Sequence, residues 1–314
     1  MRVFGLLGLG CVAAVVTISG CGPSSGPDIR ANVGRAESIR TSLRRLVGGS
    51  AEGSDSEKEA AEPTGFATLR GRFRFSGTIP APKALRVDKD VSVCRPGGKP
   101  VFSQELVVNS ANNGIKNVLV FVSSKIPSGD PKWEHESYLQ TREAVLTGDK
   151  AFDQKACRFL FHVYAIRSTQ TLEIVNSDPV GHNVKIDPPT PKVASTNVTV
   201  PANGGKATWK PGGESNVPVS VACSIHPWMS AYILPRDNPF FAVTDENGEF
   251  EIAYVPAGVE LEFRIWQEKA GFVSGNVTLN GQSVKLSKGR IKKVRFDPDQ
   301  EQNWEFVLSD AIFK

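Results

Sequence analysis

The sequence predicts an all-β protein built from β-sandwiches. Its 314 residues include 29 Gly and 21 Pro spread through short apolar runs, a composition that suits a turn-rich β protein better than a helical one. Alternating segments bounded by Gly, Pro, Asn and Asp recur along the chain, and many short strands with frequent turns are typical of sandwiches. After residue 66, no stretch keeps a helical period for three turns.

The expected strands share this alternation of apolar and polar residues. They are 67–75, 117–122, 171–176, 196–200, 217–222, 250–254, 260–266, 275–279 and 304–308. A short helix is expected within 134–146. The sequence Asp245-Glu246-Asn247-Gly248 predicts a hairpin turn between 242–244 and 249–253. The run at 66–75 can pair with either of two sandwiches, so the strand order stays open.

The first 65 residues have the pattern of an export signal and a tether. Arg2 precedes an apolar run, 4–18, that is too short to span a bilayer. The run ends Ser19-Gly20-Cys21, which resembles a bacterial lipobox with cleavage before Cys21 and acylation of its thiol. We therefore expect 1–20 to be a signal peptide and the protein to be periplasmic or on the cell surface, lipid-anchored to a membrane. An ordinary signal peptide with a chance cysteine is the alternative.

Residues 21–65 are expected to be a basic segment followed by an acidic, flexible linker. The basic part is either a short helix beside anionic headgroups or a disordered tether. The net charge of +4 is too weak and too scattered to indicate nucleic acid binding. Besides Cys11 and Cys21, the chain has three cysteines. An odd number in an exported protein predicts one disulfide and one cysteine with another role.

The stretch that carries chemistry is 219–229. A predicted strand leads into Cys223, with His226 three residues later and Met229 three residues beyond that. His182 and Asn183 follow another predicted strand about forty residues upstream. Two histidines, one cysteine and a weak axial methionine are the ligand set of blue-copper electron-transfer sites. The thiolate donates strongly to Cu(II), and the soft thioether favours Cu(I). We therefore predict one mononuclear copper centre.

These residues resemble the cupredoxin family, and within it the amicyanin-like and plastocyanin-like proteins. The resemblance lies in the short loop Cys-x2-His-x2-Met with Pro227 after His226, and in a second ligand, His182, followed by Asn183. It implies a Greek-key β-sandwich over 66–237 that carries single electrons and is not an enzyme. It also implies that Asn183 ties the two ligand segments together by hydrogen bonds.

The same resemblance implies an electron portal near His226. In this family an apolar patch around the exposed edge of the loop histidine is where a redox protein docks. Trp228 would belong to that patch, or else pack inward as core. Pro227 lacks an N–H, so it removes one possible hydrogen bond to the thiolate of Cys223 and predicts a somewhat lower reduction potential.

A second resemblance concerns the C-terminal part. The run 241–252, followed by Val255-Pro256-Ala257-Gly258, is similar to the carboxypeptidase-regulatory type of transthyretin-like module. It implies a smaller C-terminal β-sandwich over 238–314. Such a module says little about function.

The sequence leaves more than one role open for some of the remaining cysteines and histidines. We expect a disulfide between Cys94 and Cys157, the alternative being two thiols too far apart to bridge. His162 is either a core histidine bonded to a backbone carbonyl or an alternative copper ligand. His135 is expected to be solvated in a polar loop.

Three functions stay open. The protein is an electron carrier, a copper-binding or storage protein without a redox partner, or a structural or ligand-binding surface lipoprotein with a vestigial copper motif. Zinc is a weaker fit because methionine is a poor zinc ligand. With four histidines and no His-x-His pair, the chain lacks the ligands of multicopper oxidases and nitrite reductases. No Cys-x-x-Cys-His sequence for haem occurs.

Overall fold

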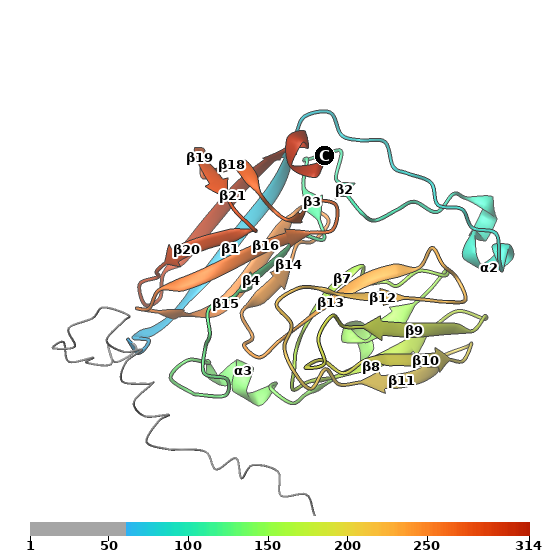
Figure 1. Ribbon diagram of the computed structural model, residues 1–314, viewed down its shortest axis with the longest axis horizontal. Coiled ribbons are helices and arrows are strands. Elements are labelled where there is room, and N and C mark those ends of the chain that lie inside the picture. Colours follow the sequence, from blue (N-terminus) through green and yellow to red (C-terminus); the bar gives the residue numbers. More distant parts are fainter. Residues whose placement is uncertain (1–60) are drawn as a thin grey trace, which may run out of the picture. The chain divides into compact units, whose positions relative to one another are not determined.

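The computed structural model describes residues 61–314, which consist mainly of β-strands and their connections (Figure 1). The prediction of an all-β protein is therefore confirmed. None of the helices among these residues is long and apolar enough to cross a membrane. The expected signal peptide (1–20), the acylation site Cys21 and nearly all of the expected tether (21–65) lie outside the described residues.

One pair of sheets, which we call the terminal sandwich, contains both ends of the described chain. Its first sheet has the order β15-β1-β21-β18-β19, with strands Glu249–Ala257, Gly65–Ser76, Glu301–Ser309, Gly275–Leu279 and Gln282–Leu286. Its second sheet has the order β14-β4-β16-β17, with strands Phe241–Val243, Leu119–Val122, Leu261–Gln267 and Gly271–Phe272, and β20 (Arg290–Val294) also pairs with β16. Both sheets contribute to one apolar core, in which the rings of Phe73 and Phe306 stack at 4.5 Å.

A second pair of sheets, the site-bearing sandwich, comes from the middle of the chain. Its larger sheet has the order β10-β9-β12-β13-β7, with strands Thr196–Val200, His182–Asp187, Val219–Ala222, Ser230–Arg236 and Val163–Arg167. Its smaller sheet has the order β11-β8-β5, with strands Gly205–Trp209, Thr171–Asn176 and Val145–Leu146, and β6 (Phe152–Gln154) pairs with β8. Their facing side chains form a separate core that includes Ile174, Val221 and Trp209.

The short elements lie in the connections. They are the ribbon of β2 (Val107–Val108) and β3 (Ile115–Lys116), the helices α2 (Val91–Cys94) and α3 (Glu136–Gln140), and the 3-10 turns Pro96–Gly98, Gly148–Lys150 and Asp310–Phe313. The helix expected within 134–146 is thus only α3. His135 accepts a hydrogen bond from the N–H of Ser137 at 3.3 Å, and its ring stacks on Tyr254 at 3.7 Å. It is half-buried and packed, rather than simply solvated as the sequence predicted.

The sheets divide the chain differently from the predicted boundaries of 66–237 and 238–314. Strand β1 pairs antiparallel with β15 and parallel with β21, and β4 pairs with β14 and β16. Two strands that precede the predicted copper ligands therefore belong to the C-terminal sandwich. Alternation reveals which face of a strand is apolar, but it carries no information about a partner more than 200 residues away.

The turn at Asp245–Gly248 forms, but it does not close the predicted hairpin. The N–H of Gly248 donates to the carbonyl of Asp245 at 3.0 Å. The flanking strands then pair in different sheets, β14 with β4 and β15 with β1. The turn is held by its neighbours, because the N–H of Phe73 donates to the carbonyl of Gly248 at 2.9 Å. It is one of the crossovers between the two sheets of the terminal sandwich.

We predict that Gly248→Ala destabilises the protein more than Gly281→Ala. Both glycines have a positive φ, 77° and 79°, so each substitution carries the left-handed penalty of about 1–2 kcal/mol. A Cβ on Gly248 would lie 2.3 Å from the carbonyl oxygen of Phe73, whereas one on Gly281 meets nothing within 4 Å. Urea unfolding of the two variants measures the difference, and equal losses of unfolding free energy would contradict the packed turn.

Candidate metal centre

Strand pairing brings the predicted ligands to one end of the site-bearing sandwich. Strand β12 runs antiparallel to both β9 and β13, and its last residue, Ala222, pairs with Lys185 in β9 and with Ser230 in β13. His182 is the first residue of β9, and Cys223 directly follows β12. The thiol and this imidazole therefore meet, although they are far apart in the sequence.

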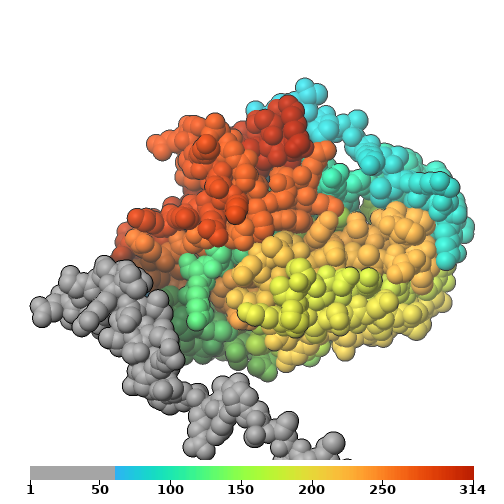
Figure 2. All heavy atoms as spheres, in the orientation of Figure 1, coloured from blue at the N-terminus to red at the C-terminus, as the bar shows by residue number. Residues whose placement is uncertain are grey.

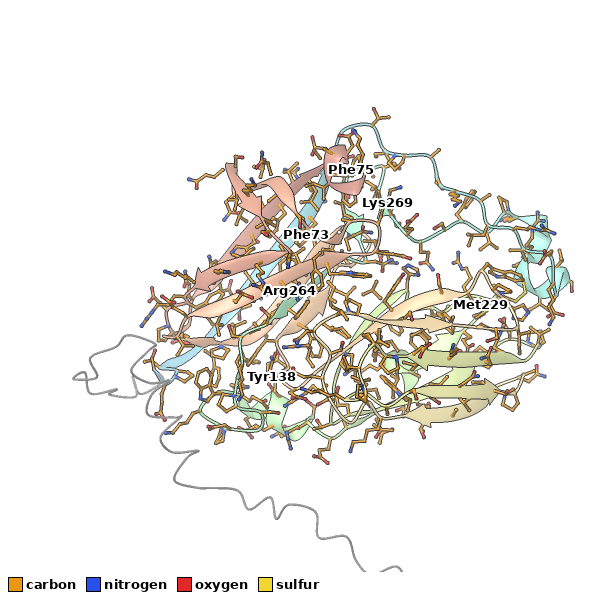
Figure 3. The ribbon with its side chains drawn as sticks, viewed as in Figure 1. Phe73, Phe75, Tyr138, Met229, Arg264 and Lys269 are labelled. Atoms are coloured by element: carbon orange, nitrogen blue, oxygen red, sulfur yellow. A yellow bond between two sulfur atoms is a disulfide. The ribbon has the colours of Figure 1, made fainter. Side chains whose placement is uncertain are left out.

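The loop from Cys223 to Met229 is closed by backbone hydrogen bonds. The N–H of Met229 donates to the carbonyl of His226 at 2.9 Å, and the N–H of Cys223 donates to the carbonyl of Met229 at 3.2 Å. The exposed fractions of these three residues are only 2%, 0% and 2%. Figure 3 places Met229 at the end of the site-bearing sandwich near α2. Met229 shares the apolar core with Cys223 and stays the predicted fourth ligand.

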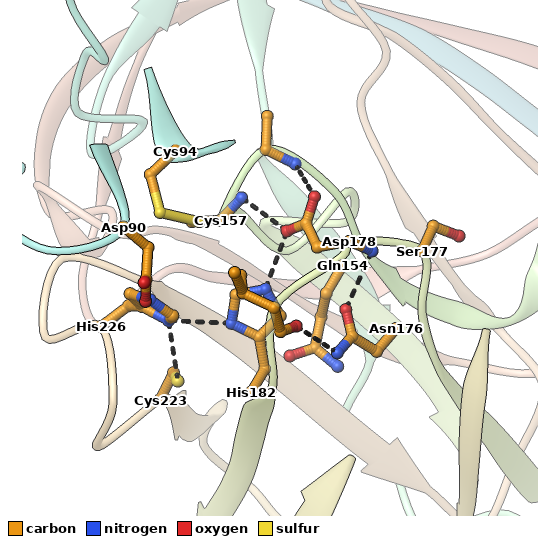
Figure 4. A network of polar contacts seen from close by, with 12 residues as sticks. Asp90, Cys94, Gln154, Cys157, Asn176, Ser177, Asp178, His182, Cys223 and His226 are labelled. Carbon is orange, nitrogen blue, oxygen red and sulfur yellow. Dashed lines mark hydrogen bonds and ion pairs between the residues drawn. A yellow bond between two sulfur atoms is a disulfide. The ribbon is translucent and has the colours of Figure 1, made fainter. Parts of the chain in front are cut away.

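Three ligand atoms converge in this buried pocket (Figure 4). The Nδ1 atoms of His182 and His226 lie 2.9 Å apart, and the Sγ of Cys223 lies 3.9 Å from the Nδ1 of His226. Neighbouring ligands around one ion, with bonds of about 2.0–2.1 Å to nitrogen and 2.3 Å to sulfur, lie about 3.3–3.6 Å apart at tetrahedral angles. The two observed separations lie on either side of that range, so the pocket fits a single ion.

Each imidazole is held from behind by a carboxylate. The Nε2 of His182 lies 2.8 Å from Oδ2 of Asp178, and the Nε2 of His226 lies 2.8 Å from Oδ2 of Asp90. An ionised carboxylate only accepts hydrogen bonds, so each Nε2 carries a proton and donates it. In a neutral imidazole of this kind, Nδ1 is an acceptor. Two acceptors 2.9 Å apart repel one another unless a proton or a metal ion lies between them.

Charge is already present in the metal-free pocket. Burial alone would raise the pKa of the Cys223 thiol, but hydrogen bonds with His182 and with the backbone N–H of Asn183 lower it to about 6. Burial lowers the pKa of His182, yet Asp178 and Cys223 raise it to about 9. The metal-free site is thus a thiolate beside an imidazolium. A bound metal ion would replace the proton of that imidazolium.

Asn183 joins the two ligand segments. Its backbone N–H donates to the Sγ of Cys223 at 3.5 Å. Its side-chain oxygen accepts from the N–H of Ser224 at 2.5 Å, and its side-chain nitrogen donates to the side chain of Asn197 at 2.6 Å. These contacts connect β9, β10 and the loop after β12, which is the arrangement that the resemblance implied for this residue.

The expected exposed edge of His226 is absent. The ring is fully buried, because Asp90 covers its Nε2 and Trp228 lies beside it with ring centroids 5.2 Å apart. Trp228 is half-buried and donates from its indole N–H to the carbonyl of Cys157 at 3.2 Å, while Pro227 is exposed. The segment that carries Asp90 precedes the ligands and has covered the surface where a portal was expected.

Contacts also define the roles of Cys94, Cys157 and His162. Cys94 and Cys157 form a disulfide, and Cys223 is the free cysteine of the described chain. The Nδ1 of His162 lies 3.1 Å from the carbonyl of Ser230, and its Nε2 bonds to Glu268. His162 belongs to none of the metal-capable clusters in residues 61–314, so the structure gives it the core position rather than that of a ligand.

Asp90 and Asp178 are the site residues that sequence reasoning missed. Asp178 lies four residues before His182, a spacing that could have drawn attention to it. Its pKa is lowered, because hydrogen bonds from His182 and from the N–H groups of Cys157 and Ala156 outweigh the effect of burial. Asp90 has no local signal, since 136 residues separate it from His226.

Comparison with known proteins leaves the family open. No protein-family model matches the chain, and no curated protein matches its sequence. The chain is similar to a Cu(I) mutant of amicyanin at 13% identity, over 30% of this chain and 82% of that one, with a TM-score of 0.24. A reduced mutant of amicyanin gives 12% identity over 37% and 98%, with a TM-score of 0.25.

A copper-containing nitrite reductase from Thermus scotoductus SA-01 is 19% identical over 30% of this chain and 22% of its own, with a TM-score of 0.24. TM-scores this low do not establish a shared fold, family or function. The case for a metal centre therefore depends on the side chains described above.

We predict that Cys223 ionises near pH 6 in the metal-free protein, instead of near 9.0. The stability that the thiolate contributes is present above the unfolded pKa and is lost as the pH falls through about 6. The thiolate absorbance is followed against pH in the wild type and in Cys223→Ser. The difference between the two curves gives the pH midpoint of Cys223 ionisation, because the absorbance of the other cysteines cancels. A midpoint close to that of an ordinary thiol would contradict the thiolate–imidazolium pair.

Proposed function

We propose that this chain is a membrane-anchored electron carrier that holds one type 1 copper ion through His182, Cys223, His226 and Met229. The observation that carries the proposal is the pair of buried Nδ1 atoms 2.9 Å apart, with a thiol of lowered pKa beside them. Bound copper supplies the one-electron Cu(II)/Cu(I) couple.

The ligand types favour copper over zinc. Two imidazoles, one thiolate and a thioether match a blue-copper site, whereas a structural zinc site prefers four nitrogen or sulfur ligands without methionine. Within residues 61–314, each cluster that could hold a metal contains His182 or His226. The described chain therefore supports one centre, which suits a carrier of single electrons better than a multicopper enzyme.

The surroundings of the site support electron transfer rather than catalysis. His182, Cys223 and His226 are buried, so no open position faces a substrate. The hydrogen bonds of Asn183, Asp178 and Asp90 hold the ligands in place. Ligands that cannot move keep the reorganisation small when an electron arrives or leaves. We propose outer-sphere transfer, with Trp228 as the partly exposed aromatic residue nearest His226 and a redox protein docking beside it.

The proposed location follows from the N-terminal sequence. Export and acylation of Cys21 would tether the carrier to a membrane through the segment 21–65. The disulfide between Cys94 and Cys157 supports this compartment, because structural disulfides persist in oxidising environments.

A copper-binding or storage protein is the second candidate. The observation that favours it is the complete burial of His226, whose Nε2 faces Asp90 instead of the surface. A site closed in this way can hold copper without exchanging electrons rapidly.

We predict that the full-length protein binds one equivalent of Cu(II) and gains an intense thiolate-to-copper band in the visible spectrum. The band should disappear in Cys223→Ser, which lacks the thiolate, and persist in His135→Gln, which alters a histidine packed on Tyr254 outside the pocket. A wild-type protein that stays colourless and binds no copper would contradict both copper functions and leave a structural or ligand-binding role as the remaining candidate.

Electron exchange separates the two copper candidates. For a carrier, we predict reduction by a small redox protein with a rate constant of at least about 10⁵ M⁻¹s⁻¹, typical of specific docking. Stopped-flow loss of the visible band measures the rate. Trp228→Ala should slow the reaction while Tyr254→Ala, on the terminal sandwich, should not. A reaction that is slow in the wild type would favour storage.

A further inference from the structure

The segment before the ligands covers the proposed copper centre. In Figures 1 and 2 the stretch around α2 lies along the end of the site-bearing sandwich. Figure 4 shows its Asp90 facing His226. The two side chains meet at 2.8 Å, between Oδ2 of Asp90 and Nε2 of His226. The imidazole is fully buried, whereas the side chain of Asp90 is 35% exposed.

The backbone of Asp90 is arranged for this contact. Asp90 is the N-cap residue of α2, with φ 48° and ψ 40°, in the left-handed region that residues other than glycine rarely adopt. An aspartate at this position usually accepts a hydrogen bond from the first turn of its helix, but here the side chain makes no capping bond. The carboxylate accepts a hydrogen bond from His226 instead of capping its own helix. An unusual backbone conformation of this kind is typical of functional sites.

A covalent link holds this segment in place. Cys94, four residues after Asp90, is joined to Cys157. The N–H of Cys157 donates to the carboxylate of Asp178 at 2.8 Å, and Asp178 in turn holds His182. The disulfide and this hydrogen bond together link the two carboxylates that orient the two imidazoles.

We infer that Asp90 is a positioning residue of the copper centre, which accepts a hydrogen bond from the Nε2–H of His226, keeps Nδ1 turned towards the metal and lowers the reduction potential. The inference rests on the proposed function. A carboxylate behind a metal-bound imidazole fixes its tautomer and makes it a stronger donor. The added negative charge stabilises Cu(II) more than Cu(I), because the oxidised ion carries the larger positive charge.

Two substitutions separate the charge of Asp90 from its hydrogen bond. Asp90→Asn removes the charge but keeps an oxygen that accepts from Nε2, and Asp90→Ala removes both. Asp88→Asn is the matched control, because Asp88 lies on the same segment, is 57% exposed and pairs with Arg86 instead of a histidine. Circular dichroism and a thiol count confirm that each variant keeps its fold and its disulfide.

In copper-loaded full-length protein, we expect Asp90→Asn to raise the midpoint potential by more than Asp88→Asn does. Asp90→Ala should also raise it and weaken copper binding by about 10- to 100-fold, the usual effect of losing such a partner. Potential shifts in both Asp90 variants that do not exceed the Asp88→Asn shift would overturn the inference.

A measurement on metal-free protein tests the role of Asp90 separately from the proposed copper function. The Nε2 proton of His226 in metal-free protein should give a downfield, slowly exchanging NMR signal in the wild type and in Asp90→Asn, and should lose both properties in Asp90→Ala, because Asp90 accepts the hydrogen bond from this nitrogen. This pattern in a protein that binds no copper would support the positioning role and reject the carrier. An unchanged Nε2–H signal in Asp90→Ala would reject the positioning role, whatever the metal content.

Discussion

The site depends on two buried imidazole nitrogens that face one another at 2.9 Å. Their outer nitrogens are committed to carboxylates, so neither inner nitrogen can turn away or find a neutral donor. Only a positive charge between them makes the arrangement favourable. The thiol of Cys223, whose pKa is lowered to about 6, adds a negative charge at the same point. The pocket is therefore suited to a cation.

The fold keeps this arrangement from relaxing. Strand β12 lies between β9 and β13, so both ligand segments are parts of one sheet. Asn183 adds hydrogen bonds across them. The disulfide joins the segment that carries Asp90 to Cys157, whose N–H donates to the carboxylate of Asp178. Rigid ligands suit a centre whose task is to change charge without changing shape. The same cover of α2 and Asp90 closes His226 off from solvent, which leaves the adjacent Trp228 as the partly exposed group through which we propose electrons pass.

The terminal sandwich shows a different constraint. Its strands β1 and β21 pair in parallel, although they come from opposite ends of the described chain. The turn at Gly248 then carries the chain from one of its sheets to the other, with no room for a side chain against Phe73. The site-bearing strands thus leave and re-enter a framework whose first and last strands are hydrogen-bonded to each other.

The sequence by itself determined the local and chemically distinctive features. Alternation placed most strands within a few residues, and the spacing of Cys223, His226 and Met229 identified the loop, because these are short-range patterns. Tertiary structure alone decided that β1 and β4 join the C-terminal strands, that the turn at 245–248 is a crossover, and that His226 is buried. It also decided that Asp90 lies behind His226. These outcomes depend on which segments meet across the fold, and a contact between residues 136 positions apart leaves no local pattern to read.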